Sequence, residues 1–148
     1  MKSWDEHFMQ LAEESATRSK DPKTQVGACI VKDKRILSLG YNGAPRKFPD
    51  ELVPLDNTAN DLYNSKNTYM CHAELNAILN YRGCLADFED ATIYVTLFPC
   101  HECLKALVQV GISEIVYKED YEKEAIVNVS KRIAEFCNVK LRKLGDDE

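Results

Sequence analysis

Two cysteines and a histidine occur in this chain at spacings that suit a metal ion. Cys100 and Cys103 lie in "TLFPCHECLKAL", and His72 lies in a separate run, "CHAELNAIL". A C-x-x-C pair at a helix start brings both sulfurs to the positive pole of the helix, which favours thiolates. The same pair alone is equally typical of a redox dithiol or of half a structural site built from four cysteines. The pair therefore predicts thiolate chemistry and leaves its purpose open.

His72 adds a nitrogen ligand, and Glu74 follows it by two residues. Helix, turn and strand separate this segment from Cys100. In a parallel β-α-β-α arrangement both helix N-termini emerge at one sheet edge, where ligands of open α/β sheets bind. Zinc takes imidazole and thiolate ligands in tetrahedral geometry, and a catalytic site keeps one position open. We therefore predict a zinc site on His72, Cys100 and Cys103, with Glu74 as a nearby acid; the competing interpretation of Glu74 is a first-turn charge stabilised by the helix dipole.

Helices and strands alternate along the chain, and they must position these residues. We expect helices at 3–16, 72–82, 99–110 and 121–137, and strands at 25–31, 35–41, 91–97, 113–118 and 139–142. Pro99 suits a first helical turn, and Gly83 suits the end of a helix. Strands that alternate with helices favour an α/β layered domain with helices on both faces and its later strands parallel. With no linker or repeat, residues 1–148 are expected to form one domain.

The remaining cysteines and the polar segment of residues 42–69 have simpler interpretations. Cys29 lies in an apolar run, and Cys137 lies on the expected apolar face of the last helix with Val129 and Phe136, so both are expected in the core. Cys71 is expected to be buried. His101 is either a pocket contact or an exposed helix residue. A loop as long as 42–69 in a compact domain is usually functional or mobile.

Composition excludes several classes of protein. The chain has 148 residues, is 45% hydrophobic and 29% charged, and carries a net charge of −5. A long nucleic acid is bound mainly by Lys and Arg, so we expect no such partner. No apolar run is long enough for a membrane span or reads as a signal peptide, so we expect a cytoplasmic protein without membrane contact.

Four blocks of the sequence resemble one family in order and over most of residues 15–117. They are "RSKDPKTQVGACIV", "GYNGAP", "CHAELNAIL" and "YVTLFPCHECLKAL". H-x-E followed by P-C-x-x-C is the signature of zinc nucleobase deaminases, and the longer blocks are similar to the deoxycytidylate (dCMP) deaminases. The resemblance implies a three-layer α/β/α cytidine-deaminase-like domain with a five-stranded mixed sheet.

The resemblance also implies a reaction. Zinc on His72, Cys100 and Cys103 would make hydroxide available at neutral pH for attack on C4 of the pyrimidine of dCMP. Glu74 would carry the proton to N3 and then to the departing amine, giving dUMP for thymidylate synthesis and ammonia. Residues 30–70 contain no Cys or His for the second, structural zinc of some family members, so we expect one Zn²⁺ per chain.

The substrate contacts follow from the resemblance as well. Asn42 would bind the sugar or base, the backbone of Ala73 and Thr96 would bind the pyrimidine edge, and Phe98 would form a wall. Arg18, Ser19 and Tyr121 are the candidates for the phosphate. For Arg18 the competing interpretation is a favourable interaction with the end of the first helix.

Regulation and assembly are further expectations from the family, namely activation by dCTP, inhibition by dTTP and a homohexamer. Two other functions compete with dCMP deamination. One is deamination of another nucleoside, a nucleobase or a tRNA base. The other is a zinc-stabilised binding module without activity, which would need a fourth ligand, for which Cys71 is the candidate.

Overall fold

A five-stranded mixed β-sheet organises the part of the chain that the structure describes. The computed structural model describes residues 1–146. Its strands are β1 (Gly27–Lys32), β2 (Arg35–Tyr41), β3 (Thr92–Leu97), β4 (Glu114–Glu119) and β5 (Lys140–Lys143). They lie in the order β2-β1-β3-β4-β5, with β1 antiparallel to both neighbours and β3, β4 and β5 parallel. The sheet confirms the predicted fold class, including its parallel later strands.

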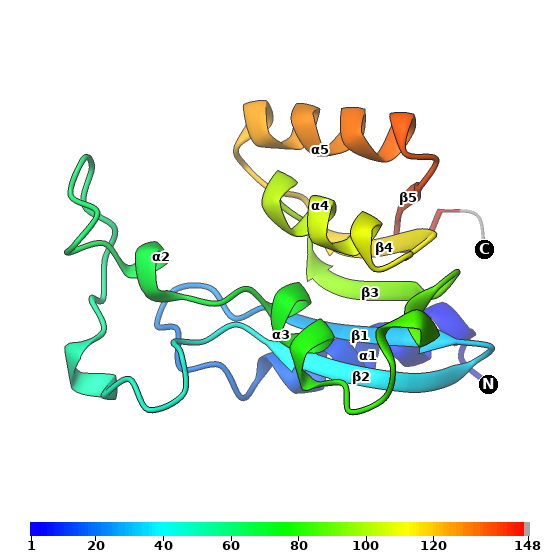
Figure 1. Cartoon of the computed structure of the whole chain (residues 1–148), viewed down its shortest axis with the longest axis horizontal. Helices are drawn as coiled ribbons and strands as arrows, with labels where there is room; N and C mark the ends of the chain where they lie inside the picture. The colour runs from blue at the N-terminus through cyan, green and yellow to red at the C-terminus, as the bar shows by residue number, and fades with distance from the viewer. Residues whose placement is uncertain (147–148) are drawn as a thin grey trace.

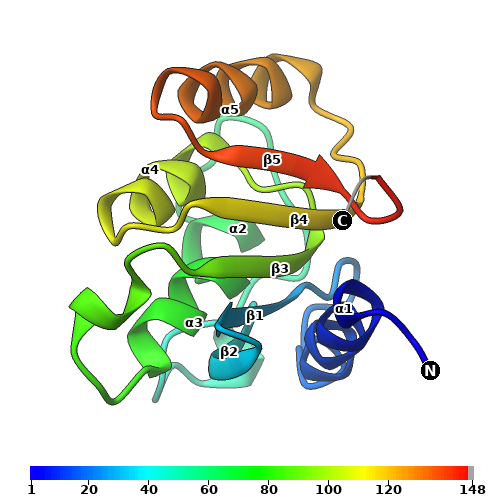
Figure 2. The ribbon, with the colours of Figure 1, turned by 90° about the vertical axis from the view of Figure 1, so that its right-hand side faces the viewer.

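Helices cover both faces of this sheet (Figures 1 and 2). α1 (Trp4–Ala16) packs on one face, and α3 (Ala73–Asn80), α4 (His101–Gln109) and α5 (Glu124–Phe136) lie on the other. α2 (Lys66–Tyr69) lies away from the sheet, and short 3₁₀ turns occur at Asp50–Leu52 and Leu85–Phe88. Successive strand residues point to opposite faces, so β1 places Cys29 against α1 and Ile30 against the other helices. The burial of Cys29 is as predicted.

Two glycines allow helices to approach the sheet closely. A Cβ on Gly40 of β2 would lie 2.4 Å from the Ala73 oxygen and the Ala77 nitrogen of α3, and one on Gly27 would lie 1.9 Å from the Ala12 oxygen of α1. Contacts this short are excluded for any side chain. Gly40 therefore fixes how closely the start of α3 approaches β2, and with it the position of the residue before the helix.

Side chains of α3 also bond to the outer edge of β2. The Asn76 amide donates to the Tyr41 carbonyl at 2.8 Å, and the Asn80 amide donates to the Leu39 carbonyl at 3.0 Å. β2 has no strand neighbour on this side among the described residues. The two asparagines give its outward carbonyls partners and hold α3 parallel to the edge.

The segment between β2 and α3 extends away from the sheet and carries α2 (Figure 1). We call residues 44–70 the arm. Gly43 and Cys71 exchange backbone hydrogen bonds of 3.0 and 2.7 Å, which close its base. The arm confirms the long, largely irregular segment expected from the sequence, apart from its two short helical turns.

Two expectations for the helices are wrong. α3 ends at Asn80 instead of residue 82, and Gly83 does not cap it. Tyr81 leaves the helix with φ −69° and ψ 135° because its ring packs on Phe88, with 4.8 Å between centroids, and its hydroxyl donates to Asp87. Tertiary packing thus ends the helix before its sequence pattern does.

The apolar face of α5 is narrower than predicted. Phe136 is 75% exposed, Val129 is 45% exposed, and Cys137 is exposed too. The helix packs through its small residues Ser130 and Ala134, both buried, and the Ser130 hydroxyl donates to the Pro99 carbonyl at 2.9 Å. Close approach to α4 needs these small side chains and leaves the larger ones outside. The acidic residues at the end of the sequence, 146–148, lie partly outside the described residues.

A buried ionic cluster ties the first helix to the last strand. The Arg142 guanidinium binds Asp5 through two nitrogens and donates from Nε to Glu114 at 2.8 Å, while the Tyr94 hydroxyl donates to Asp5 at 2.7 Å. The Asp5 side chain is 6% exposed and that of Arg142 10%.

Among residues 1–146, no helix is long and apolar enough to cross a membrane.

Stability in acid should depend on Asp5. Burial raises the pKa of its carboxyl, but the hydrogen bonds from Arg142 and Tyr94 outweigh burial and hold the pKa below its usual value. The stabilisation is therefore complete above the unfolded pKa of about 3.9 and is lost as pH falls through the lower folded pKa. Asp5→Asn should cost about 3 kcal/mol of unfolding free energy at neutral pH and flatten the loss below pH ~4, as measured by urea denaturation. An unchanged acid slope would contradict this role.

Candidate metal centre

The N-termini of α3 and α4 carry the three predicted metal ligands. His72 is the N-cap residue of α3, Cys100 is the N-cap residue of α4, and Cys103 lies in the first turn of α4. Strand β3 ends at Leu97, and the following Phe98 and Pro99 lead directly into Cys100. The helix dipoles of both helices therefore point their positive ends at this group, which stabilises thiolates.

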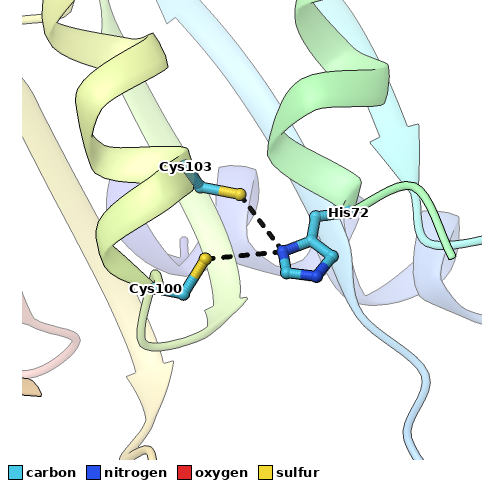
Figure 3. A group of neighbouring side chains, drawn as sticks. All are labelled: His72, Cys100 and Cys103. Carbon is cyan, nitrogen blue, oxygen red and sulfur yellow. Dashed lines mark hydrogen bonds between the residues drawn. The ribbon is translucent and has the colours of Figure 1, made fainter. Parts of the chain in front are cut away.

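One nitrogen lies between two sulfurs at this point (Figure 3). His72 Nδ1 lies 3.3 Å from Cys103 Sγ and 3.5 Å from Cys100 Sγ, and the three ligand atoms lie within 4.8 Å of one another. With Zn–N of about 2.05 Å and Zn–S of about 2.3 Å, a tetrahedral set separates nitrogen from sulfur by about 3.6 Å. The donor atoms thus have both the chemistry and the spacing that Zn²⁺ requires.

The pKa values of the Cys100 and Cys103 thiols are shifted in opposite directions, and this bears on how the two cysteines would bind a cation. Its hydrogen bond with Cys103, aided by His72, lowers the pKa of Cys100 although burial opposes the shift. The bond with Cys100 and burial both raise the pKa of Cys103. The hydrogen bond with Cys100 also raises the pKa of His72. The first thiolate forms readily and the second does not, so a bound cation would supply the charge that two thiolates need.

Glu74 lies beside this group without belonging to it. Its residue is 5% exposed, and burial raises the pKa of its carboxyl to about 7, against the opposing effect of the His72 charge. Such a carboxyl takes up and releases a proton near neutral pH, as a general acid–base requires. Among residues 1–146 the metal-ligating group consists of the three predicted residues; Cys71 is half-buried and outside it.

A cavity of about 330 Å³ opens beside the group, and we call it the catalytic cavity. His72, Glu74 and Cys100 form its floor, and Ala73, Leu97 and Phe98 form its apolar wall. Lys23, Tyr121 and Lys123 lie at other points of its lining, and the arm contributes Asn57, Lys66, Asn67 and Met70. The cavity therefore joins a polar floor to an apolar wall and a basic lining.

Some of the predicted substrate residues line this cavity, and others lie outside it. Ala73, Phe98 and Tyr121 line the cavity. Thr96 is buried, and its hydroxyl accepts a hydrogen bond from the Gly27 nitrogen at 3.1 Å, so its side chain joins two strands.

Asn42 lines the cavity, but its amide is already bonded. Its oxygen accepts from the Val26 nitrogen at 2.9 Å, and its nitrogen donates to the Thr24 carbonyl at 2.9 Å and to Asp21 at 3.4 Å. The side chain therefore braces the loop at residues 21–26, which forms part of the cavity wall.

The other two phosphate candidates lie outside this cavity. Arg18 lines a neighbouring cavity of about 380 Å³. Ser19 is buried, and its hydroxyl accepts from the Asp21 nitrogen at 3.2 Å. His101 is half-buried and lies 3.4 Å from Glu102, and it does not line the catalytic cavity. The lysines of the lining were missed from the sequence because no local motif marks them.

Comparisons with known proteins agree with this geometry. The family model for the cytidine and deoxycytidylate deaminase zinc-binding region matches residues 2–119. The chain is 43% identical to the deoxycytidylate deaminase of Mus musculus over 142 residues, covering 95% of this chain and 79% of the mouse protein. The human deoxycytidylate deaminase is 42% identical with the same coverage.

A solved structure has the same fold. The crystal structure of dCMP deaminase from the cyanophage S-TIM5 in complex with dCMP and dUMP superimposes with a TM-score of 0.73 at 25% identity. The alignment covers 97% of this chain and 99% of the phage chain.

Removal of one thiolate should abolish zinc retention. We expect about one zinc per chain in the wild type, and less than about a tenth of that in Cys100→Ser and Cys103→Ser, because a hydroxyl is a much weaker zinc ligand than a thiolate. Elemental analysis after dialysis against a chelator measures this. Cys84→Ser is the matched control, since Cys84 is exposed and outside the group. Full zinc content in either ligand variant would show that the metal is held elsewhere.

Proposed function

We propose that this chain, which belongs to the cytidine and deoxycytidylate deaminase family, hydrolyses dCMP to dUMP and ammonia. The observation that carries the proposal is a buried carboxyl, Glu74, beside a three-residue ligand set at the floor of a cavity that holds basic side chains. The relatives at 42–43% identity are deoxycytidylate deaminases, which supports dCMP over other amino-pyrimidines and purines. An inert structural zinc site would need neither the cavity nor the acid.

In this mechanism His72, Cys100 and Cys103 hold Zn²⁺. When bound, the ion lowers the pKa of water so that hydroxide is available at neutral pH. Glu74 takes the proton of the attacking water and gives it to N3 of the pyrimidine as oxygen adds at C4. The same carboxylate then takes the proton of the hydroxyl now on C4 and gives it to the amino group; the C4=O bond forms, the C4–N bond breaks, and ammonia leaves. One water is consumed, and Glu74 ends the cycle as the carboxylate that began it.

The lining of the cavity suits a nucleoside monophosphate. Phe98 is 3% exposed and packs edge-on against Tyr117 at 4.9 Å between centroids, so its ring forms a rigid wall for a base. Lys123 belongs to no ion pair among residues 1–146 and, together with the Tyr121 hydroxyl, offers donors for a phosphate. Lys23, by contrast, forms an ion pair with Asp56 of the arm. We assign the phosphate to Tyr121 and Lys123.

Regulation by nucleotides and assembly belong to this proposal too. The neighbouring cavity is lined by five basic residues, Arg18, Lys20, Arg46, Lys47 and Lys66, and two acidic ones, Asp21 and Asp50. This excess of positive charge supports binding of a more highly charged anion such as dCTP or dTTP. Leu75 and Leu79 of α3 are 38% and 66% exposed on a single chain, which supports association into a homo-oligomer such as the hexamer expected from the sequence.

Glu74→Gln tests the chemical step. The amide cannot carry a proton, so we expect kcat for ammonia release from dCMP to fall by about 10²–10⁴-fold with zinc content unchanged. Wild-type turnover by this variant would disprove the assignment. A panel of dCMP, CMP, deoxycytidine and guanine tests the substrate, and preference for another member of the panel would replace the proposed function.

Lys123→Met tests the phosphate contact. Loss of a charge-assisted hydrogen bond should raise KM for dCMP by about tenfold or more, with little change for deoxycytidine, which has no phosphate. Lys131→Met, at an exposed position of α5, the helix that Lys123 precedes, is the matched control. Arg18→Ala is the decisive comparison: if it weakens dCMP selectively and Lys123→Met does not, the phosphate lies at Arg18 instead.

A further inference from the structure

The arm is attached to the body by ion pairs to a short strip, residues 20–23. Lys20 binds Asp50 at 2.7 Å, Lys23 binds Asp56, and Asp21 binds Lys66 at 2.9 Å. The outer two pairs are exposed, with side-chain exposures of 57–78%, and exposed pairs contribute little.

The central pair differs from the other two. The side chains of Lys66 and Asp21 are 6% and 3% exposed. A charge buried to this extent is held in place by its partner, because water cannot replace the contact. Among the described residues, this is the one buried ion pair that joins the arm to the body.

Asp21 also shapes the wall of the catalytic cavity. Its Oδ1 accepts from the Lys23 nitrogen at 2.8 Å and from the Thr24 nitrogen at 3.0 Å, and its Oδ2 receives the Asn42 amide at 3.4 Å. Asn42 in turn holds Val26, the residue before β1. The carboxylate that receives Lys66 is therefore the same one that sets the course of residues 21–26.

The arm supplies part of the cavity beside this pair. Asn57 and Asn67 line the catalytic cavity on either side of Lys66 in the sequence, and each depends on local contacts. Asn57 Oδ1 accepts from the Asn67 nitrogen at 2.9 Å, and the Lys66 nitrogen donates to the Asp56 carbonyl at 2.9 Å. These hydrogen bonds connect the two asparagines to the segment that carries Lys66. Lys66 and Asp21 also line the neighbouring cavity, so the pair forms the wall between the two.

We propose that Lys66 is a positioning residue for the substrate: its buried ion pair with Asp21 docks the arm and thereby holds one side of the catalytic cavity in its binding shape. The expected effect on substrate binding rests on the proposed function, since it assumes that dCMP is the substrate. Lys66 touches none of the metal ligands and acts through Asp21 and the arm. Loss of the pair should therefore weaken substrate binding and spare the chemical step.

Two single variants test this. Lys66→Met removes the cation and keeps the length of the side chain. Asp21→Asn removes the charge and keeps an oxygen that can accept from the Lys23 and Thr24 nitrogens. For each we expect KM for dCMP to rise by about tenfold, kcat to stay within about twofold, and zinc content to be unchanged. Amide hydrogen exchange should accelerate in residues 56–70 and at Lys23 and Thr24.

Lys118→Met is the matched control. It breaks an ion pair of the same length, 2.9 Å, between β4 and Glu13 of α1, far along the chain from the arm. KM and arm exchange should be unchanged in this variant.

The double variant Asp21→Asn/Lys66→Met separates positioning from stability. It leaves no unpaired buried charge, so stability to urea should recover towards that of the wild type, whereas KM should stay high because the arm has lost its attachment. Recovery of KM together with stability would show that the pair is merely structural and overturn the proposal. Unchanged KM or unchanged arm exchange in the single variants would do the same. If the wild type does not act on dCMP, the proposed function fails, and the exchange data alone decide whether Lys66 docks the arm.

Discussion

The metal centre depends on two helix N-termini being held at a fixed separation. His72 and Cys100 are the residues that precede α3 and α4, so the backbone position of each ligand residue is set by its helix. Gly40 lets α3 lie directly on β2, and the Ser130–Pro99 hydrogen bond fixes the chain just before α4. The spacings of 3.3 and 3.5 Å therefore depend on backbone packing at the residues adjacent to the ligands, Ala73 and Pro99. This rigidity matters because a zinc site tolerates only small changes in ligand position.

The electrostatics of the site follow from the same arrangement. Two positive helix ends lower the cost of thiolates, while burial raises the cost of a carboxylate. The pKa of the Cys100 thiol is lowered by its hydrogen bonds with Cys103 and His72, whereas burial raises the pKa of the Glu74 carboxyl. Groups whose proton affinities are driven apart in one cavity are typical of acid–base catalysis. The ligand set and the proton carrier are distinguished by burial and partners, and residue type alone would not separate them.

The sequence predicted the sheet and the order of its elements, and it singled out His72, Cys100, Cys103 and Glu74, which the structure brings together, because each leaves a local signal. Alternating apolar residues predict β1 and β3, and C-x-x-C after a proline predicts the start of α4. Contacts between distant segments leave no such signal. Lys66 reads as one more charge in a polar segment, and only the fold shows it buried against Asp21. Asn42 was predicted to contact the sugar or base, which stays a prediction; it lines the cavity, and only the fold shows that its amide also braces residues 21–26. Tyr81 and Phe136 also differ from expectation: Tyr81 leaves its helix to pack on Phe88, and Phe136 is exposed because α5 packs through Ser130 and Ala134.

The two asparagines of α3 have a consequence beyond the placement of that helix. An outermost strand with open carbonyls is a template onto which a strand of another molecule can add, and uncontrolled addition of this kind leads to aggregation. Asn76 and Asn80 occupy the carbonyls of Tyr41 and Leu39, so this border of the sheet is blocked by side chains. Helix α3, which carries the proposed proton carrier Glu74, thus also protects the edge of β2 from pairing with a strand of another copy of the chain.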